Sequence, residues 1–173
     1  MKLTPLTKKF VLHWGEMGTR WGINRTVAQI HALLYVSPEP LNAEEIASTL
    51  SVARSNVSTS LKELQNWGLV KVVHVLGDRR DHFETLKDVW TLFQIVMNER
   101  KRREINPTIA VLRAAVAESD SAGKEDDYAR EQMGKMLEFF ESATTCYEEI
   151  GKLAPSSLRK LMKMGGKVTA LLR

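Results

Sequence analysis

The stretch from residue 41 to residue 84 constrains the fold most, because it combines two short helical patterns with a strand pair in a fixed order. Asn42 is a good N-cap, and acidic residues follow it where the first helical turn would lie. A short turn at residues 51–53 leads to a second helical pattern over residues 54–66. Its apolar residues repeat at the spacing of one helix face: Val57, Leu61 and Leu64.

After Gly68 the pattern changes from helical to extended. Residues 69–75 are rich in β-branched side chains, Gly77 and Asp78 favour a turn, and residues 79–84 return as a second strand. Two short helices followed by a hairpin with basic residues at its tip are the order of a winged helix-turn-helix. We therefore expect a mostly α-helical protein with a small two-stranded β-wing.

The outward face of the second helix carries the residue types that DNA recognition needs. At about 100° per residue, Ser55, Thr59 and Lys62 point away from the apolar face, and Glu63 lies at the margin. Small hydroxyl side chains allow close approach to base edges, whereas carboxylates would repel phosphates. The side chains that we predict to contact DNA are Arg54, Ser55, Asn56, Ser58, Thr59, Lys62, Arg79 and Arg80.

These residues have different predicted roles. Arg54 is expected on the DNA backbone, and the polar residues that follow it in the helix are expected near bases or phosphates. Arg79 and Arg80 would reach the neighbouring minor groove or its phosphates. Asp78 and Asp81 flank these two arginines, and we expect them to hold the guanidinium groups in position.

Composition agrees with a folded protein that works in a reducing cytoplasm. Hydrophobic residues make up 43% and charged residues 27% of the 173, and the formal net charge is +4, a mild basic excess that is compatible with nucleic acid. Cys146 is the only cysteine, so neither a disulfide within the chain nor a multi-cysteine zinc site is expected, and the thiol should be buried. The chain has no apolar stretch of membrane-spanning length and no secretion signal at residues 1–10.

The flanking segments are predicted to be helical. Phe10, Trp14, Met17 and Trp21 fall on one face of a first helix, which we expect to fill the core or a dimer interface. Downstream, a helix should end in the charged run at residues 99–104, and Asn106 with Pro107 should open the next one. Residues 119–124 are expected to form a loop.

The sequence resembles a known family along these stretches. IASTLSVARSNVSTSLKELQNWGLV followed by GDRRDHFE resembles the DNA-binding module of the multiple-antibiotic-resistance regulator (MarR) superfamily. FVLHWGEMGTRWGINRTVAQIHALLY is similar to the GbsR-like branch of that superfamily. The resemblance covers about residues 10–97, and it includes the later helices only through their helical character.

This resemblance implies a sequence-specific transcriptional regulator. It implies a homodimer built by the N- and C-terminal helices, an inverted-repeat operator in double-stranded DNA, and repression or activation that a small effector relieves. On this basis residues 1–23 form an N-terminal helix that is part of the dimer interface. Residues 24–87 form the winged helix-turn-helix, and residues 88–173 form a helical dimerisation region. We expect a repressor.

Other interpretations stay open at this point. Trp14, Trp21 and Trp90 are candidate effector-binding residues, because tryptophan faces attract quaternary ammonium groups. The winged helix can also dock a protein partner without binding DNA, although the carboxylate-poor outward face favours DNA. A metal or redox sensor is a further alternative, but the four histidines show no metal-binding spacing. No catalytic motif is present, so we expect neither enzymatic activity nor a cofactor.

Overall fold

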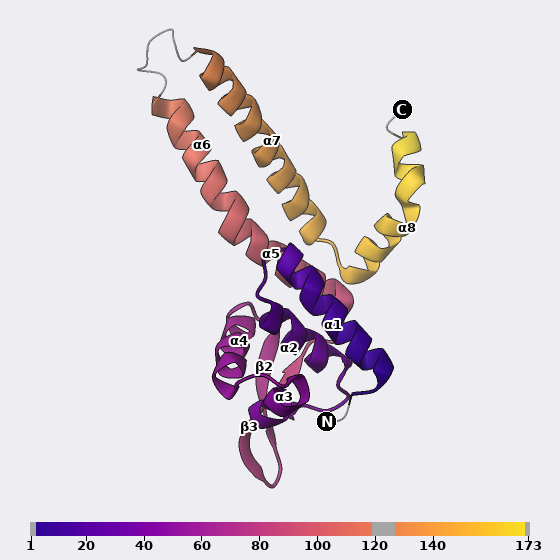
Figure 1. The fold of residues 1–173 in the computed structure, drawn as a ribbon. Helices are drawn as coiled ribbons and strands as arrows, with labels where there is room; N and C mark the ends of the chain where they lie inside the picture. Colours follow the sequence, from indigo (N-terminus) through magenta and orange to yellow (C-terminus); the bar gives the residue numbers. More distant parts are fainter. Residues whose placement is uncertain (1–2, 119–126, 172–173) are drawn as a thin grey trace. The chain divides into compact units, whose positions relative to one another are not determined.

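The computed structural model describes residues 3–118 and 127–171, and the chain separates into two compact units, Met1–Ile95 and Val96–Arg173 (Figure 1). The loop predicted at residues 119–124 lies outside the described residues. The first unit contains α1 (Pro5–Arg20), α2 (Arg25–Val36), β1 (Leu41–Asn42), α3 (Ala43–Leu50), α4 (Arg54–Asn66), β2 (Val70–Val75), β3 (Asp78–Thr85) and most of α5 (Val89–Arg100). The second unit continues through η1 (Lys101–Ile105), α6 (Asn106–Glu118), α7 (Asp127–Gly151) and α8 (Pro155–Leu171). The mostly α-helical fold is confirmed.

The wing contains one strand more than the sequence predicts. The sheet is antiparallel with three strands in the order β1, β3, β2. β2 and β3 form the expected hairpin, and Gly77 in its turn has a φ of 86°, which a residue with a Cβ rarely adopts. β1 adds the pairs Leu41 with Phe83 and Asn42 with His82. A strand of two residues is too short to show an alternating pattern, so the sequence does not predict it.

The core of the first unit lies between α2, α3, α4 and the sheet. Ile30 and Leu33 of α2 and Ile46 of α3 are completely shielded from solvent. The buried side chains of α4 include the three predicted from their spacing: Val57, Leu61 and Leu64. The apolar face of α4 is therefore fixed against this core, and its polar face points outward.

Local signals in the sequence set the helix ends. Asn24 caps α2, with its Oδ1 accepting a hydrogen bond of 2.8 Å from the backbone N–H of Thr26. Asn42 caps α3 in the same way, accepting from the N–H of Glu45 at 3.0 Å. The Glu45 carboxylate accepts from the N–H of Asn42 at 2.9 Å, which completes a capping box. The predicted cap at Asn42 is confirmed.

Small residues, rather than the aromatic stripe, pack α1 against α2. Val11, Gly15 and Gly18 are the buried residues of α1, and a Cβ added at Gly18 would lie 2.4 Å from the Cβ of Ala28. The predicted aromatic face is half-buried at Phe10 and Trp14 and 49% exposed at Trp21. The closest approach of the two helices therefore uses small residues, and the aromatic rings lie beside it, so their predicted place in the core or a dimer interface stays a prediction.

Lys87 joins the end of the wing to the end of α2. Its ammonium group donates hydrogen bonds to the backbone carbonyls of Leu34, Tyr35 and Ser37, at 2.6, 3.0 and 2.8 Å. These carbonyls lie at the C-terminus of α2, where a positive charge is favourable. The connection between β3 and α5 is thereby attached to the core helix.

The second unit is built on a hairpin of α6 and α7. Ile109 and Leu112 of α6 are buried, whereas no described residue of α7 is. Arg113 on α6 pairs with Glu141 on α7 at 2.6 Å. Cys146 on α7 is exposed, so the prediction of a buried thiol is wrong.

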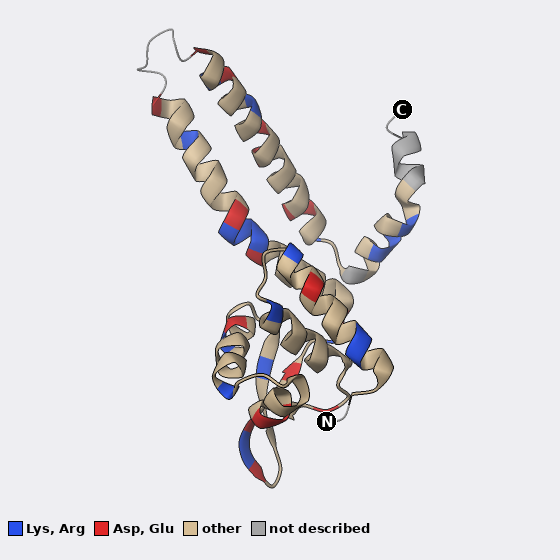
Figure 2. Ribbon diagram, viewed as in Figure 1, with Lys and Arg blue, Asp and Glu red and all other residues tan. Residues whose placement is uncertain are grey.

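No helix break occurs where the sequence predicts one. The π-helical turn η1 connects α5 to α6, and Asn106 has helical φ and ψ values instead of those of an N-cap. Figure 2 shows charged residues of both signs where α5 passes into α6. Arg102 and Arg103 both bond to Glu99, at 2.5 and 2.6 Å, and Lys101 pairs with Glu148 of α7 at 2.6 Å. The basic side chains of the charged run thus form ion pairs within the second unit.

Two classes of feature are absent from the described parts of the chain. No helix there is both long and apolar enough to span a lipid bilayer. The same residues contain no cluster of three or more His, Cys, Asp or Glu side chains with the arrangement of a metal site.

Candidate nucleic-acid interface

The predicted DNA-contacting residues lie at the surface of α4 and of the wing. Figure 1 shows the β2–β3 hairpin projecting beyond the helices of the first unit. On α4 the side chains of Arg54, Asn56 and Thr59 are among those exposed, and Ser58 is half-buried. The remaining predicted residues are also exposed: Ser55, Lys62, Arg79 and Arg80. None of the exposed residues of α4 is acidic, and Glu63 is half-buried.

The start of α4 is open to an acceptor group. Its N-cap residue is Ala53, which makes no side-chain capping hydrogen bond. Ser51, in the preceding turn, has a φ of 55°, a left-handed conformation that lets the chain turn sharply from α3 into α4. Amide N–H groups in the first turn of a helix are favourable partners for phosphate oxygens.

Asp78 holds the wing residue Arg80 in one orientation. The Arg80 Nε and Nη2 atoms donate to the two carboxylate oxygens of Asp78 at 2.9 and 2.5 Å, and the Arg80 backbone N–H donates to Oδ1 at 3.0 Å. Hydrogen bonding from Arg80 holds the pKa of the Asp78 carboxyl well below its usual range, so this carboxyl is ionised throughout the physiological range. The predicted support from Asp78 is confirmed, whereas Asp81 bonds to neither arginine among the residues described.

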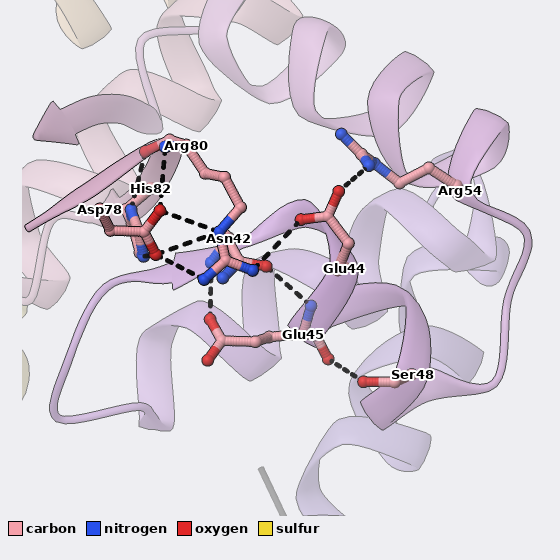
Figure 3. A network of polar contacts seen from close by, with 8 residues as sticks. All are labelled: Asn42, Glu44, Glu45, Ser48, Arg54, Asp78, Arg80 and His82. Atoms are coloured by element: carbon pink, nitrogen blue, oxygen red, sulfur yellow. Dashed lines mark hydrogen bonds and ion pairs between the residues drawn. The ribbon is translucent and has the colours of Figure 1, made fainter. Parts of the chain in front are cut away.

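Glu44, on α3, connects α4, the predicted recognition helix, to the wing (Figure 3). Its Oε1 atom accepts a hydrogen bond from Nη1 of Arg54, and its Oε2 atom lies 3.9 Å from Nη1 of Arg80. One carboxylate therefore lies between two arginines that come from different elements. The sequence pattern indicates only a favourable charge at a helix N-terminus for Glu44 and contains no signal for this bridge.

Two buried residues fix the wing against α3. Asn42 is 1% exposed, pairs with His82 across β1 and β3, and also caps α3. The His82 ring lies with Nε2 3.5 Å from Asp78 and Nδ1 3.0 Å from the carbonyl of Arg80. The N-x-x-E pattern at residues 42–45 is a capping-box signal, but the sequence contains no signal for the pairing with His82.

Several residues that we predict to contact DNA line a hollow of about 310 Å³ between α3, α4 and the wing. Arg54, Ser58 and Lys62 of α4 line it together with Arg80 of the wing and Glu44 of α3. A second hollow of about 210 Å³ is lined by Asn56 and Thr59, beside the N-terminus of α2. Residues that we predict to contact DNA thus line two hollows, one between α4, α3 and the wing and one between α4 and α2.

The three candidate effector-binding tryptophans are not all brought together. The rings of Trp14 and Trp21 meet edge to face with centroids 6.1 Å apart. Phe10 stacks on Trp14 at 5.4 Å. Trp90, on α5, forms no ring contact with either tryptophan within the described residues.

An exposed polar helix, α4, followed by a hairpin in which one arginine is held by an aspartate, is the architecture of a winged helix-turn-helix. Comparisons with known proteins agree with this architecture. A sequence model of the MarR family matches residues 21–81. The chain is 24% identical over 139 residues to the HTH-type transcriptional repressor GbsR of Bacillus subtilis (strain 168), covering 79% of this chain and 77% of that protein. These similarities agree with the predicted resemblance to MarR-family transcriptional regulators, and the matched model covers most of the winged helix.

The fold also has a counterpart among solved structures. A crystal structure of a transcriptional regulator superposes with a TM-score of 0.56 at 22% identity, covering 84% of this chain and 99% of that one. This likeness agrees with the fold assignment, and the similarity to GbsR agrees with the GbsR-like branch.

Proposed function

We propose that the protein is a homodimeric repressor that binds an inverted repeat in double-stranded DNA. The observation that carries this proposal is the outward face of α4, whose exposed residues are polar or basic and include no carboxylate. A helix with this face fits a major groove, where base edges offer donors and acceptors and phosphates exclude acidic groups. The similarity to a repressor supports the sign of regulation.

In this proposal α4 and the wing have separate roles. Ser55, Asn56, Ser58, Thr59 and Lys62 approach bases or phosphates in the major groove, and Arg54 contacts the backbone. Arg79 and Arg80 reach the adjacent minor groove or its phosphates. Because Asp78 already orients the Arg80 guanidinium, this contact requires little further ordering.

Exposed apolar side chains support the dimer. Val111 on α6 and Phe139 on α7 are 68% and 65% exposed, although both helices belong to a compact hairpin. On α1, Leu6 is 79% exposed beside the aromatic face. Apolar surface of this kind commonly marks a protein–protein interface, and a two-fold dimer would place two recognition helices about 34 Å apart. Light scattering on the purified chain tests the assembly, and a monomer at micromolar concentration would contradict it.

We also propose that a small effector modulates DNA binding. Trp14 and Trp21 form an exposed aromatic corner on α1, and such rings attract apolar or cationic ligands. Quenching of tryptophan fluorescence by candidate ligands tests this assignment, with Trp14→Phe as the variant that should lose the response.

The wing provides the sharpest test of DNA binding. Arg80→Ala should weaken binding to every duplex and make the plot of log K against log salt less steep by about one, since one phosphate contact is lost. Arg113→Ala removes the same charge from α6, where it pairs with Glu141, and should change neither quantity. Equal affinity and equal slope for Arg80→Ala would exclude the wing from the interface.

A further inference from the structure

We propose that Glu44 acts as an internal competitor of DNA phosphate, lowering the affinity of the interface for any duplex. This inference rests on the proposed DNA-binding function and concerns the regulation of the same surface. The Glu44 carboxylate engages Arg54, at the start of the recognition helix, and Arg80, in the wing (Figure 3). A carboxylate between two guanidinium groups makes the kind of contact that a backbone phosphate makes with the same groups.

The competitor can be displaced, because its ion pairs are at the surface. The side chains of Glu44, Arg54 and Arg80 are 52%, 54% and 54% exposed. Ion pairs between groups this exposed contribute little to stability, and water or salt weakens them further. An arriving phosphate can therefore take the place of the carboxylate without disrupting any buried structure.

Loss of the Glu44 ion pairs does not disturb the N-terminus of α3. The N-terminus of α3 is capped by Asn42 and Glu45, which bond reciprocally, so Glu44 is not part of the cap. Its neutralisation should leave the fold intact and change only the charge at the interface. This separates Glu44 from Glu45, whose carboxylate is needed for the capping box.

The two arginines would respond differently to the loss of Glu44. Arg80 keeps its bidentate contact with Asp78 and so stays oriented. Arg54 loses the negative charge that Glu44 places against its guanidinium, so this group becomes available for a phosphate. The gain in affinity should therefore depend mainly on Arg54.

The test compares Glu44→Gln with the wild-type chain by fluorescence anisotropy, on a duplex of arbitrary sequence and at three salt concentrations. Glu39→Gln is the matched control, because it removes one exposed carboxylate from the segment between α2 and β1, outside α1, α4 and the wing hairpin. We expect Glu44→Gln to bind roughly two- to fivefold more tightly, the range that one exposed ion pair allows. Its plot of log K against log salt should be steeper by about one, and Glu39→Gln should match wild type.

A second arm tests the route of the effect. In an Arg54→Gln background, Glu44→Gln should give a smaller gain than in wild type. Thermal unfolding followed by circular dichroism checks that each variant is folded. The inference is overturned if folded Glu44→Gln binds no more tightly than wild type, or if Glu39→Gln gains as much. If wild type and all variants fail to bind duplex DNA, the proposed function fails together with this inference.

Discussion

Replacing Gly18 with alanine should destabilise the first unit, because the packing of α1 on α2 leaves no room for a methyl group. The added Cβ would lie 2.4 Å from the Cβ of Ala28, and ordinary carbon–carbon contact begins at about 3.5 Å. Both atoms are attached directly to helix backbones, so no rotamer change relieves the clash and the helices must separate by about 1 Å. Overpacking of this kind costs about 1–3 kcal/mol, and alanine recovers up to about 1 kcal/mol of helix propensity. We expect a net loss of roughly 1–2 kcal/mol.

Gly15 provides the matched comparison on the same helix. A Cβ there would lie 2.5 Å from Cγ of Gln29, which belongs to a flexible, half-buried side chain that can rotate away. Gly15→Ala should therefore cost clearly less than Gly18→Ala. Combining Gly18→Ala with Ala28→Gly removes the opposing methyl group and should recover part of the loss.

Urea unfolding followed by circular dichroism measures these differences, at one protein concentration so that any association affects all variants equally. Equal stability of Gly18→Ala and Gly15→Ala would refute the packing argument. So would the failure of Ala28→Gly to improve the Gly18→Ala variant.

Two further predictions concern side chains near α2. Burial lowers the pKa of His31 to about 4, with a smaller effect from Lys87, and its Nε2 atom has no hydrogen-bond partner among the residues that the structure describes. The His31 imidazole binds a proton more readily in the unfolded chain, so its contribution to the free energy of unfolding is full above about pH 6.5 and falls as the pH is lowered toward 4. Urea unfolding should show a loss of roughly 2 kcal/mol at pH 5. The His31→Leu variant should not show this loss. Lys87→Met should lower the free energy of unfolding by about 1–2 kcal/mol, since it leaves the carbonyls at the end of α2 without their donor. Lys71→Met, which removes only an exposed ion pair with Glu84, should cost less than about 1 kcal/mol in the same assay.

Local patterns predicted the winged helix well. The bounds of α4, the caps at Asn24 and Asn42 and the apolar face of α4 all depend on short-range spacing, which a single sequence displays directly. The contact between Asp78 and Arg80 also joins residues two positions apart. Features set within one or two turns of chain were therefore accessible without a structure.

Features that depend on tertiary packing were not accessible. The aromatic stripe of α1 has helical spacing, but its neighbouring stripe of Gly15 and Gly18 allows the closer approach to α2, and spacing alone does not rank the two faces. The π-helical turn η1 continues the helical backbone into Asn106, so the predicted cap at Asn106 does not form. The bridge from Glu44 to Arg54 and Arg80 joins three elements, so no local pattern predicts it.

The central claim is that two copies of this chain read a symmetric DNA sequence through α4. Selection from a random duplex library by the purified full chain, followed by sequencing of the bound DNA, tests this claim directly. The account predicts enrichment of an inverted repeat whose half-site centres are about one helical turn, or roughly 10 base pairs, apart. Enrichment of a single unsymmetric site, or of no sequence at all, would contradict it.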